Sequence, residues 1–124
     1  MEFENLNIKI AMSMIKICTI YYKKTGDIKA DDAISKLRLM VNTGNTREAL
    51  APVLPEILKF ANLRKDLLLK KDIFAFDGYK INIPDYEILI ESAKKVYEIS
   101  NEEEKKIFWR SINNIISYTS KLYC

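Results

Sequence analysis

Apolar residues recur three and four positions apart along almost the whole chain, and this spacing constrains the fold more than any other feature. Such a period places apolar side chains on one face of an α-helix. Residues typical of helix ends interrupt the pattern at Gly26, Gly44, Pro55 and Ser100. The sequence therefore predicts an all-α, single-domain bundle of about five helices that spans residues 1–124.

The residues at the interruptions set the expected helix limits. We expect a first helix over residues 7–24 and a second that begins at Asp31 or Asp32 and ends at about 43. A short helical turn over 46–51 is followed by a third helix over 55–71. Asp85 is expected to cap a fourth helix over 85–99, and a Ser100–Glu103 capping box begins a fifth that runs nearly to the C-terminal end. Gly26 and Gly44 are expected to be left-handed residues just past helix ends.

The first expected helix is apolar around most of its circumference. Two stripes, one through Ile15 and one through Met14, leave only a narrow polar arc: Lys9, Ser13, Lys16, Lys23 and Lys24. A helix of this kind lies at the centre of a bundle or also contacts a partner. We favour the central position.

Residues 73–83 break the helical period. Apolar and polar residues alternate on both sides of Asp77-Gly78, which predicts a small β-hairpin with a type I′ turn between the third and fourth helices. Pairing about this turn places five apolar side chains on one face: Phe74, Phe76, Tyr79, Ile81 and Ile83. A lone two-stranded ribbon is marginal in water, so this face must be covered. We favour its own helices as the cover, and a partner strand is the alternative.

The sequence offers no recognisable catalytic machinery. It has no histidine, and its three glycines cannot form a phosphate-binding loop. The carboxylates at Asp31-Asp32 and in residues 101–104 lie at expected helix N-termini, where the helix dipole favours them without any metal. We expect no enzyme, no cofactor and no metal site, and we place an enzyme with an unseen site third among the functions.

Several features indicate an intracellular, soluble protein. No apolar run approaches the roughly 20 residues of a membrane span, and the acidic, polar start is unlike a secretory signal. Cys18 is expected to be buried and Cys124 exposed, without a CxxC motif. The abundance of Lys, Ile and Asn indicates an AT-rich genome. The expected location is cytoplasmic, or the host cytoplasm or virion for a viral protein.

Two binding functions remain. The first is a protein-protein interaction or assembly protein, such as a viral structural or host-interaction factor or a homodimer. Its candidate interface residues are Phe74, Phe76, Tyr79, Ile81 and Trp109. The alternative is a mildly basic accessory protein on nucleic acid, in keeping with the net charge of +3. Its candidate contacts are Lys59, Arg64, Lys65, Lys70 and Lys71.

Basic and aromatic residues also interleave in residues 58–71 and 104–111. A single-stranded nucleic acid would need these cations for its phosphates and an open aromatic face for its bases. The aromatic residues of both segments fall on the apolar side of the expected helices. We therefore interpret them as core and the charges as a solvated face.

Overall fold

The computed structural model describes residues 2–81, 83 and 86–123. These residues form seven α-helices and one 3-10 helix, and they contain no β-strand. The helices are α1 (Glu2–Thr25), α2 (Ile28–Thr43), α3 (Thr46–Leu50), α4 (Leu54–Leu63), α5 (Lys65–Leu69), η1 (Ile73–Phe76), α6 (Glu87–Ile99) and α7 (Glu102–Tyr123). The prediction of an all-α bundle is confirmed. Among the residues described, none of the helices has the length and apolar character needed to traverse a bilayer.

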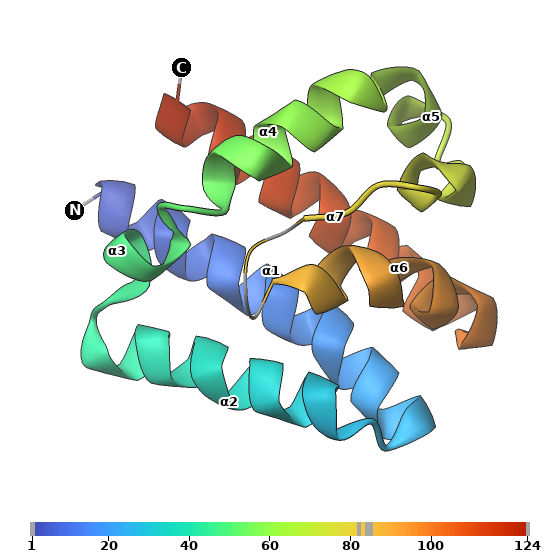
Figure 1. Cartoon of the computed structure of the whole chain (residues 1–124), viewed down its shortest axis with the longest axis horizontal. Helices are drawn as coiled ribbons and strands as arrows, with labels where there is room; N and C mark the ends of the chain where they lie inside the picture. The colour runs from blue at the N-terminus through green and yellow to red at the C-terminus, as the bar shows by residue number, and fades with distance from the viewer. Residues whose placement is uncertain (1, 82, 84–85, 124) are drawn as a thin grey trace.

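Helix α1 lies at the centre of the bundle. It contacts α2, α3, α6 and α7, and it runs between α2 and α7 (Figure 1). Both expected stripes are largely buried: Ile10, Met14 and Ile17 lie in the core on one, and Ala11, Ile15 and Cys18 on the other. Met12, on the second stripe, is exposed. The polar arc is narrower than predicted, because Ser13 is buried.

The predicted ends of the first two helices are confirmed, whereas the predicted start of α2 is displaced along the chain. Gly26 and Gly44 are left-handed as predicted, with φ of +68° and +70°. The cap of α2 is Asp27 rather than Asp31 or Asp32, because the Asp27 carboxylate accepts a hydrogen bond from the Lys29 amide at 2.9 Å. That bond starts the helix one turn earlier than predicted.

The capping box of α7 lies one residue beyond the predicted Ser100–Glu103 pair. The Asn101 side chain accepts from the Glu104 amide, and the Glu104 carboxylate accepts from the Asn101 amide, both at 2.9 Å. The Ser100 hydroxyl instead donates to the Val96 carbonyl in the preceding helix. The predicted cap of α6, Asp85, lies outside the described residues.

The region predicted as one helix over 55–71 is divided in two. Pro55 occupies the first turn of α4 as expected. The helix then stops at Leu63, because Arg64 adopts φ −113° and ψ 20°, outside the helical region. The Arg64 guanidinium donates to the Asp77 carbonyl at 3.1 Å and so ties this break to the next connection.

The predicted β-hairpin at 73–83 is wrong for the residues described there, which exclude Asn82. Asp72 caps a 3-10 turn by accepting from the Phe74 amide at 3.0 Å, so residues 73–76 are helical. Asp77 has φ −70° and ψ 130°, and Gly78 has φ +69°. A type I′ turn needs positive φ at both positions, whereas these angles fit a type II turn. The Asp-Gly signal therefore marked a turn of another type.

An aromatic cluster fixes η1 against the bundle. The Phe76 ring lies 5.3 Å from that of Phe60 on α4 and 5.8 Å from that of Phe108 on α7. Phe74, two residues earlier, points outward and is 58% exposed, whereas Phe76 is 5% exposed. In the predicted ribbon both side chains would share one face, but in the 3-10 turn they point in different directions.

This difference gives the first testable prediction. Phe76→Ala should lower the free energy of unfolding by about 3–5 kcal/mol, since it leaves a cavity in the aromatic cluster. Phe74→Ala is the matched control and should cost less than about 1 kcal/mol. Urea denaturation of both variants measures the effect. Equal losses would favour the ribbon over the 3-10 turn.

Candidate functional site

The predicted partner-interface residues do not form one open surface. Phe76, Ile81 and Trp109 are buried, and Tyr79 is half-buried. Burial and the nearby Glu56 carboxylate raise the pKa of the Tyr79 phenol. Only Phe74 among these five is open to a partner in this conformation.

The predicted nucleic-acid contacts do not gather at one site. Lys65 and Lys70 are exposed on and beside α5, and Arg64 is engaged with the Asp77 carbonyl. Lys59 lines a cavity of about 440 Å³ that also contains Glu56, so charges of both signs meet there. Lys71 lines a different and more basic cavity.

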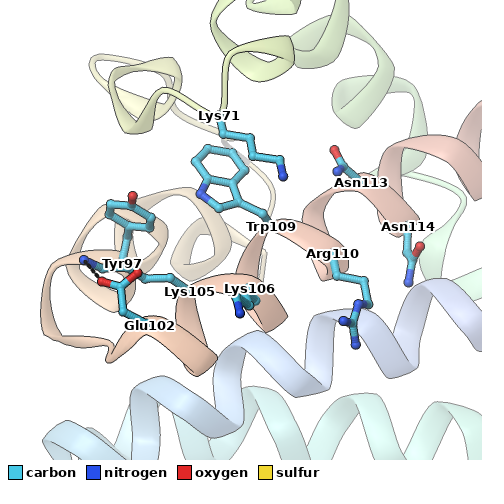
Figure 2. A pocket seen from close by; sticks show the side chains of 9 residues that line it. All are labelled: Lys71, Tyr97, Glu102, Lys105, Lys106, Trp109, Arg110, Asn113 and Asn114. Carbon is cyan, nitrogen blue, oxygen red and sulfur yellow. Dashed lines mark ion pairs between the residues drawn. The ribbon is translucent and has the colours of Figure 1, made fainter.

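The cavity that contains Lys71 is the strongest candidate site. It has a volume of about 610 Å³ and is formed by α7, by Tyr97 of α6 and by the connection after α5 (Figure 2). Its lining residues are Lys71, Tyr97, Glu102, Lys105, Lys106, Trp109, Arg110, Asn113 and Asn114. We call this cavity the α7 pocket. It joins Lys71 and Trp109, which the sequence suggested for two different functions.

Positive charge dominates the α7 pocket. Its lining includes four cationic side chains, Lys71, Lys105, Lys106 and Arg110, against the single carboxylate of Glu102. The ammonium group of Lys105 lies 3.8 Å from that carboxylate, and Lys106 pairs with Glu103 at 3.6 Å. Within the described part of the chain, Lys71 and Arg110 form no ion pair. These two charges are therefore available to an anion.

The aromatic side chains of the pocket are already engaged. The Trp109 indole is 6% exposed and packs against Phe76, Tyr97 and Phe108, with ring centroids 5.2–6.3 Å apart. The Lys105 ammonium lies 4.9 Å from the centroid of the Tyr97 ring and covers it. The pocket therefore offers cations and the amides of Asn113 and Asn114 to a ligand, and no free face for base stacking.

Lys71 holds a strained backbone at the edge of the pocket. Its φ is +54°, the left-handed value that side chains with a Cβ adopt at a cost. The Lys71 amide donates to the Leu68 carbonyl at 3.1 Å, which closes α5. Strained residues of this kind concentrate at binding sites, where the surrounding structure holds them.

Sequence reasoning missed most of the cationic part of this pocket. It interpreted the charges of residues 104–111 as a solvated face and did not name Lys105, Lys106 or Arg110 as contacts. The spacing of Lys106, Arg110 and Asn113 at i, i+4 and i+7 places them on one side of α7 and was the available signal. The approach of Lys71, far away in sequence, carried no such signal.

The other described residues offer neither a metal site nor a reactive thiol. The described residues contain no group of three or more His, Cys, Asp or Glu side chains placed to hold a metal ion. Burial raises the pKa of the Cys18 thiol to about 11, which keeps it protonated at neutral pH. The predicted exposure of Cys124 falls outside the described residues.

Comparisons with known proteins add no family to this description. No protein-family model matches the chain, and neither the curated proteins nor the solved structures contain a significant match.

The strain at Lys71 can be tested by stability. Lys71→Gly relieves a left-handed penalty of about 1–2 kcal/mol, partly offset by the greater freedom of the unfolded chain. The expected net effect is a free energy of unfolding higher by roughly 0.5–1 kcal/mol. Lys71→Ala, the control, keeps the strain and should change it by less than about 0.5 kcal/mol. Urea denaturation compares them, and equal stabilities would contradict the strained geometry.

Proposed function

We propose that this protein is a non-catalytic accessory protein that binds the backbone of nucleic acid through the α7 pocket. The observation that carries the proposal is the gathering of four Lys and Arg side chains around one cavity with a single carboxylate. Phosphate contacts by such side chains release counterions and supply most of the sequence-independent affinity for nucleic acid.

The chemistry of the pocket favours a phosphate backbone over a protein surface. Protein interfaces usually depend on apolar or aromatic anchors that become fully desolvated. The Trp109 side chain, which lines this pocket, is already buried in the molecule's own core. Interfaces with nucleic acid are more polar and more positive, as this lining is.

The large exposed apolar side chains among the described residues support the same choice, because they are distributed over seven elements. They are Met12, Tyr22, Ile28, Leu39, Leu63, Leu69, Phe74, Ile99, Ile107 and Tyr123. Single exposed apolar residues are normal on a protein surface and mark no interface. The clustered cations are the more distinctive feature.

The available side chains support a binding role over a catalytic one. The chain has no histidine. Its one described cysteine is buried, so it offers no thiolate nucleophile at neutral pH. The pocket residues Lys71, Arg110 and Asn113 instead provide donors that hold an anion in place.

The binding prediction uses fluorescence anisotropy with a labelled 20-base-pair duplex of random sequence. The wild type should bind, and its affinity should fall steeply between about 50 and 200 mM salt as counterions are recaptured. Arg110→Glu should weaken binding about tenfold or more, since a hydrogen bond to a charged group contributes about 1.5–3 kcal/mol. It should also reduce the salt slope by about one.

Lys59→Glu provides the matched control, because it makes the same change of charge in the other cavity. It should alter the affinity by less than about threefold, as expected of a long-range charge effect screened by salt. Absence of salt-sensitive binding by the wild type would reject the proposal. Equal weakening by Arg110→Glu and Lys59→Glu would show that net charge, rather than the pocket, governs binding.

One observation favours a second candidate, a protein-interaction or assembly role. Leu69 and Phe74 are 74% and 58% exposed on the neighbouring elements α5 and η1. The exposed area of two side chains is far smaller than the roughly 800 Å² that each partner buries in a standard interface. The Lys94 ammonium also lies 5.1 Å from the Phe74 ring centroid and competes for that face.

Oligomeric state separates the two functions. If nucleic acid is the partner, the free protein should sediment as a monomer at about 10 µM in reducing buffer, because the apolar patch is too small for a stable dimer. Analytical ultracentrifugation of the wild type and Phe74→Asp makes the comparison. A wild-type dimer that Phe74→Asp converts to a folded monomer would favour the assembly role.

A further inference from the structure

Helices α1 and α7 run side by side in opposite directions. At one end the Lys24 ammonium lies 3.1 Å from the Glu104 carboxylate. At the other end the Lys9 ammonium lies 5.6 Å from the centre of the Tyr118 ring. These two contacts fix the register of the pair, so Lys16 of α1 lies level with the part of α7 that carries Arg110. Figure 2 shows the Arg110 side chain directed from α7 toward α1.

The exposed edge of α1 is a row of lysines. Lys9, Lys16 and Lys23 are seven residues apart and exposed. Seven residues are about two helical turns, so the lysines share one face at intervals of about 10.5 Å. Ser13 and Ile20, on the side of α1 toward α7, are buried. The row therefore borders α7 directly. We call it the α1 lysine row.

The carboxylates in the first turn of α7 are already compensated. Glu102, Glu103 and Glu104 of the first turn of α7 each lie within 4 Å of a lysine: Lys105, Lys106 and Lys24 respectively. The Asn101 amide and Lys24 lower the pKa of Glu104, as expected of a carboxylate that accepts these hydrogen bonds. In the part of the chain described, the three lysines of the row form no ion pair.

From this arrangement we infer that the nucleic acid extends from the α7 pocket onto the α1 lysine row, which forms a second backbone-binding segment. The first and last lysines of the row are fourteen positions apart, which is about 21 Å along the helix. A duplex carries about one phosphate charge for every 1.7 Å of its axis, so a row of this length faces several phosphates of both strands. The surface is thus an extended track for a polyanion, and a single small anion would not need the row. This inference rests on the proposed nucleic-acid function.

An acidic protein segment is the alternative occupant of such a track. The row has a fixed spacing on one rigid helix, which suits the regular charge of a nucleic-acid backbone. Among the described side chains of α1, the large exposed apolar ones are Met12 and Tyr22, ten residues apart, whereas a protein interface usually depends on apolar anchors that cluster. The observations therefore favour nucleic acid.

The test compares three charge reversals in the intact protein with the labelled 20-base-pair duplex. The variants are Lys16→Glu/Lys23→Glu in the row, Arg110→Glu in the pocket, and Lys59→Glu/Lys80→Glu in the other cavity as the matched double control. The row variant should weaken binding about tenfold or more and reduce the salt slope by about two, one for each lost phosphate contact. The control should change the affinity by less than about threefold. Circular dichroism confirms that each variant is folded.

Lysine acetylation with mass spectrometry gives an independent readout. Bound duplex should protect Lys16 and Lys23 together with Lys71, and should leave Lys59 and Lys80 reactive. If Arg110→Glu weakens binding while the row variant matches the control and Lys16 stays reactive, the inference is wrong and the proposed function stands. If the wild type does not bind the duplex, the proposed function fails. Displacement of the duplex by poly-glutamate at equal charge concentration would assign the track to an acidic protein.

Discussion

The burial of α1 is the constraint on which the rest of the structure depends. Four other helices pack around it, because its apolar side chains cover most of its circumference. The narrow face left open to water carries Lys9, Lys16 and Lys23. Since α7 packs along one border of that face, the demands of the core also determine where the cations of the two helices meet. The basic surface is in this sense a consequence of the packing.

The sequence could predict the helical part of the fold, because the helical period and the residues that end helices depend on neighbouring positions in the chain. Gly26, Gly44 and Pro55 act where their backbone preferences require. The failures arise where two local solutions compete. Asp77-Gly78 suits both a type I′ and a type II turn, and the carboxylate of Asp72, by capping a 3-10 turn, selects the latter. Long-range contacts such as the one from Arg64 to the Asp77 carbonyl carry no sequence signal.

The candidate site was predictable only in fragments for the same reason. Lys71 and Trp109 were each singled out from the sequence, but for different partners. Their meeting depends on how the connection after α5 returns to α7, and a left-handed residue at Lys71 sets that return. The small net charge of +3 gives no sign of these clustered cations, because acidic side chains elsewhere in the chain offset their charge. For binding a polyanion, the local arrangement matters more than the total.

The aromatic cluster decides what kind of recognition the basic surface can support. Phe76, Phe108 and Trp109 pack against one another to fix η1 on the bundle, and this leaves their faces unavailable to a ligand. The contacts of lysine and arginine side chains to phosphates position a protein on nucleic acid, but they carry no sequence information themselves. A protein built in this way would bind a backbone by charge and spacing, with affinity that depends on salt and on the length of the nucleic acid. A sequence preference would come from the shape of the nucleic acid, or from contacts of the Asn113 and Asn114 amides to base edges.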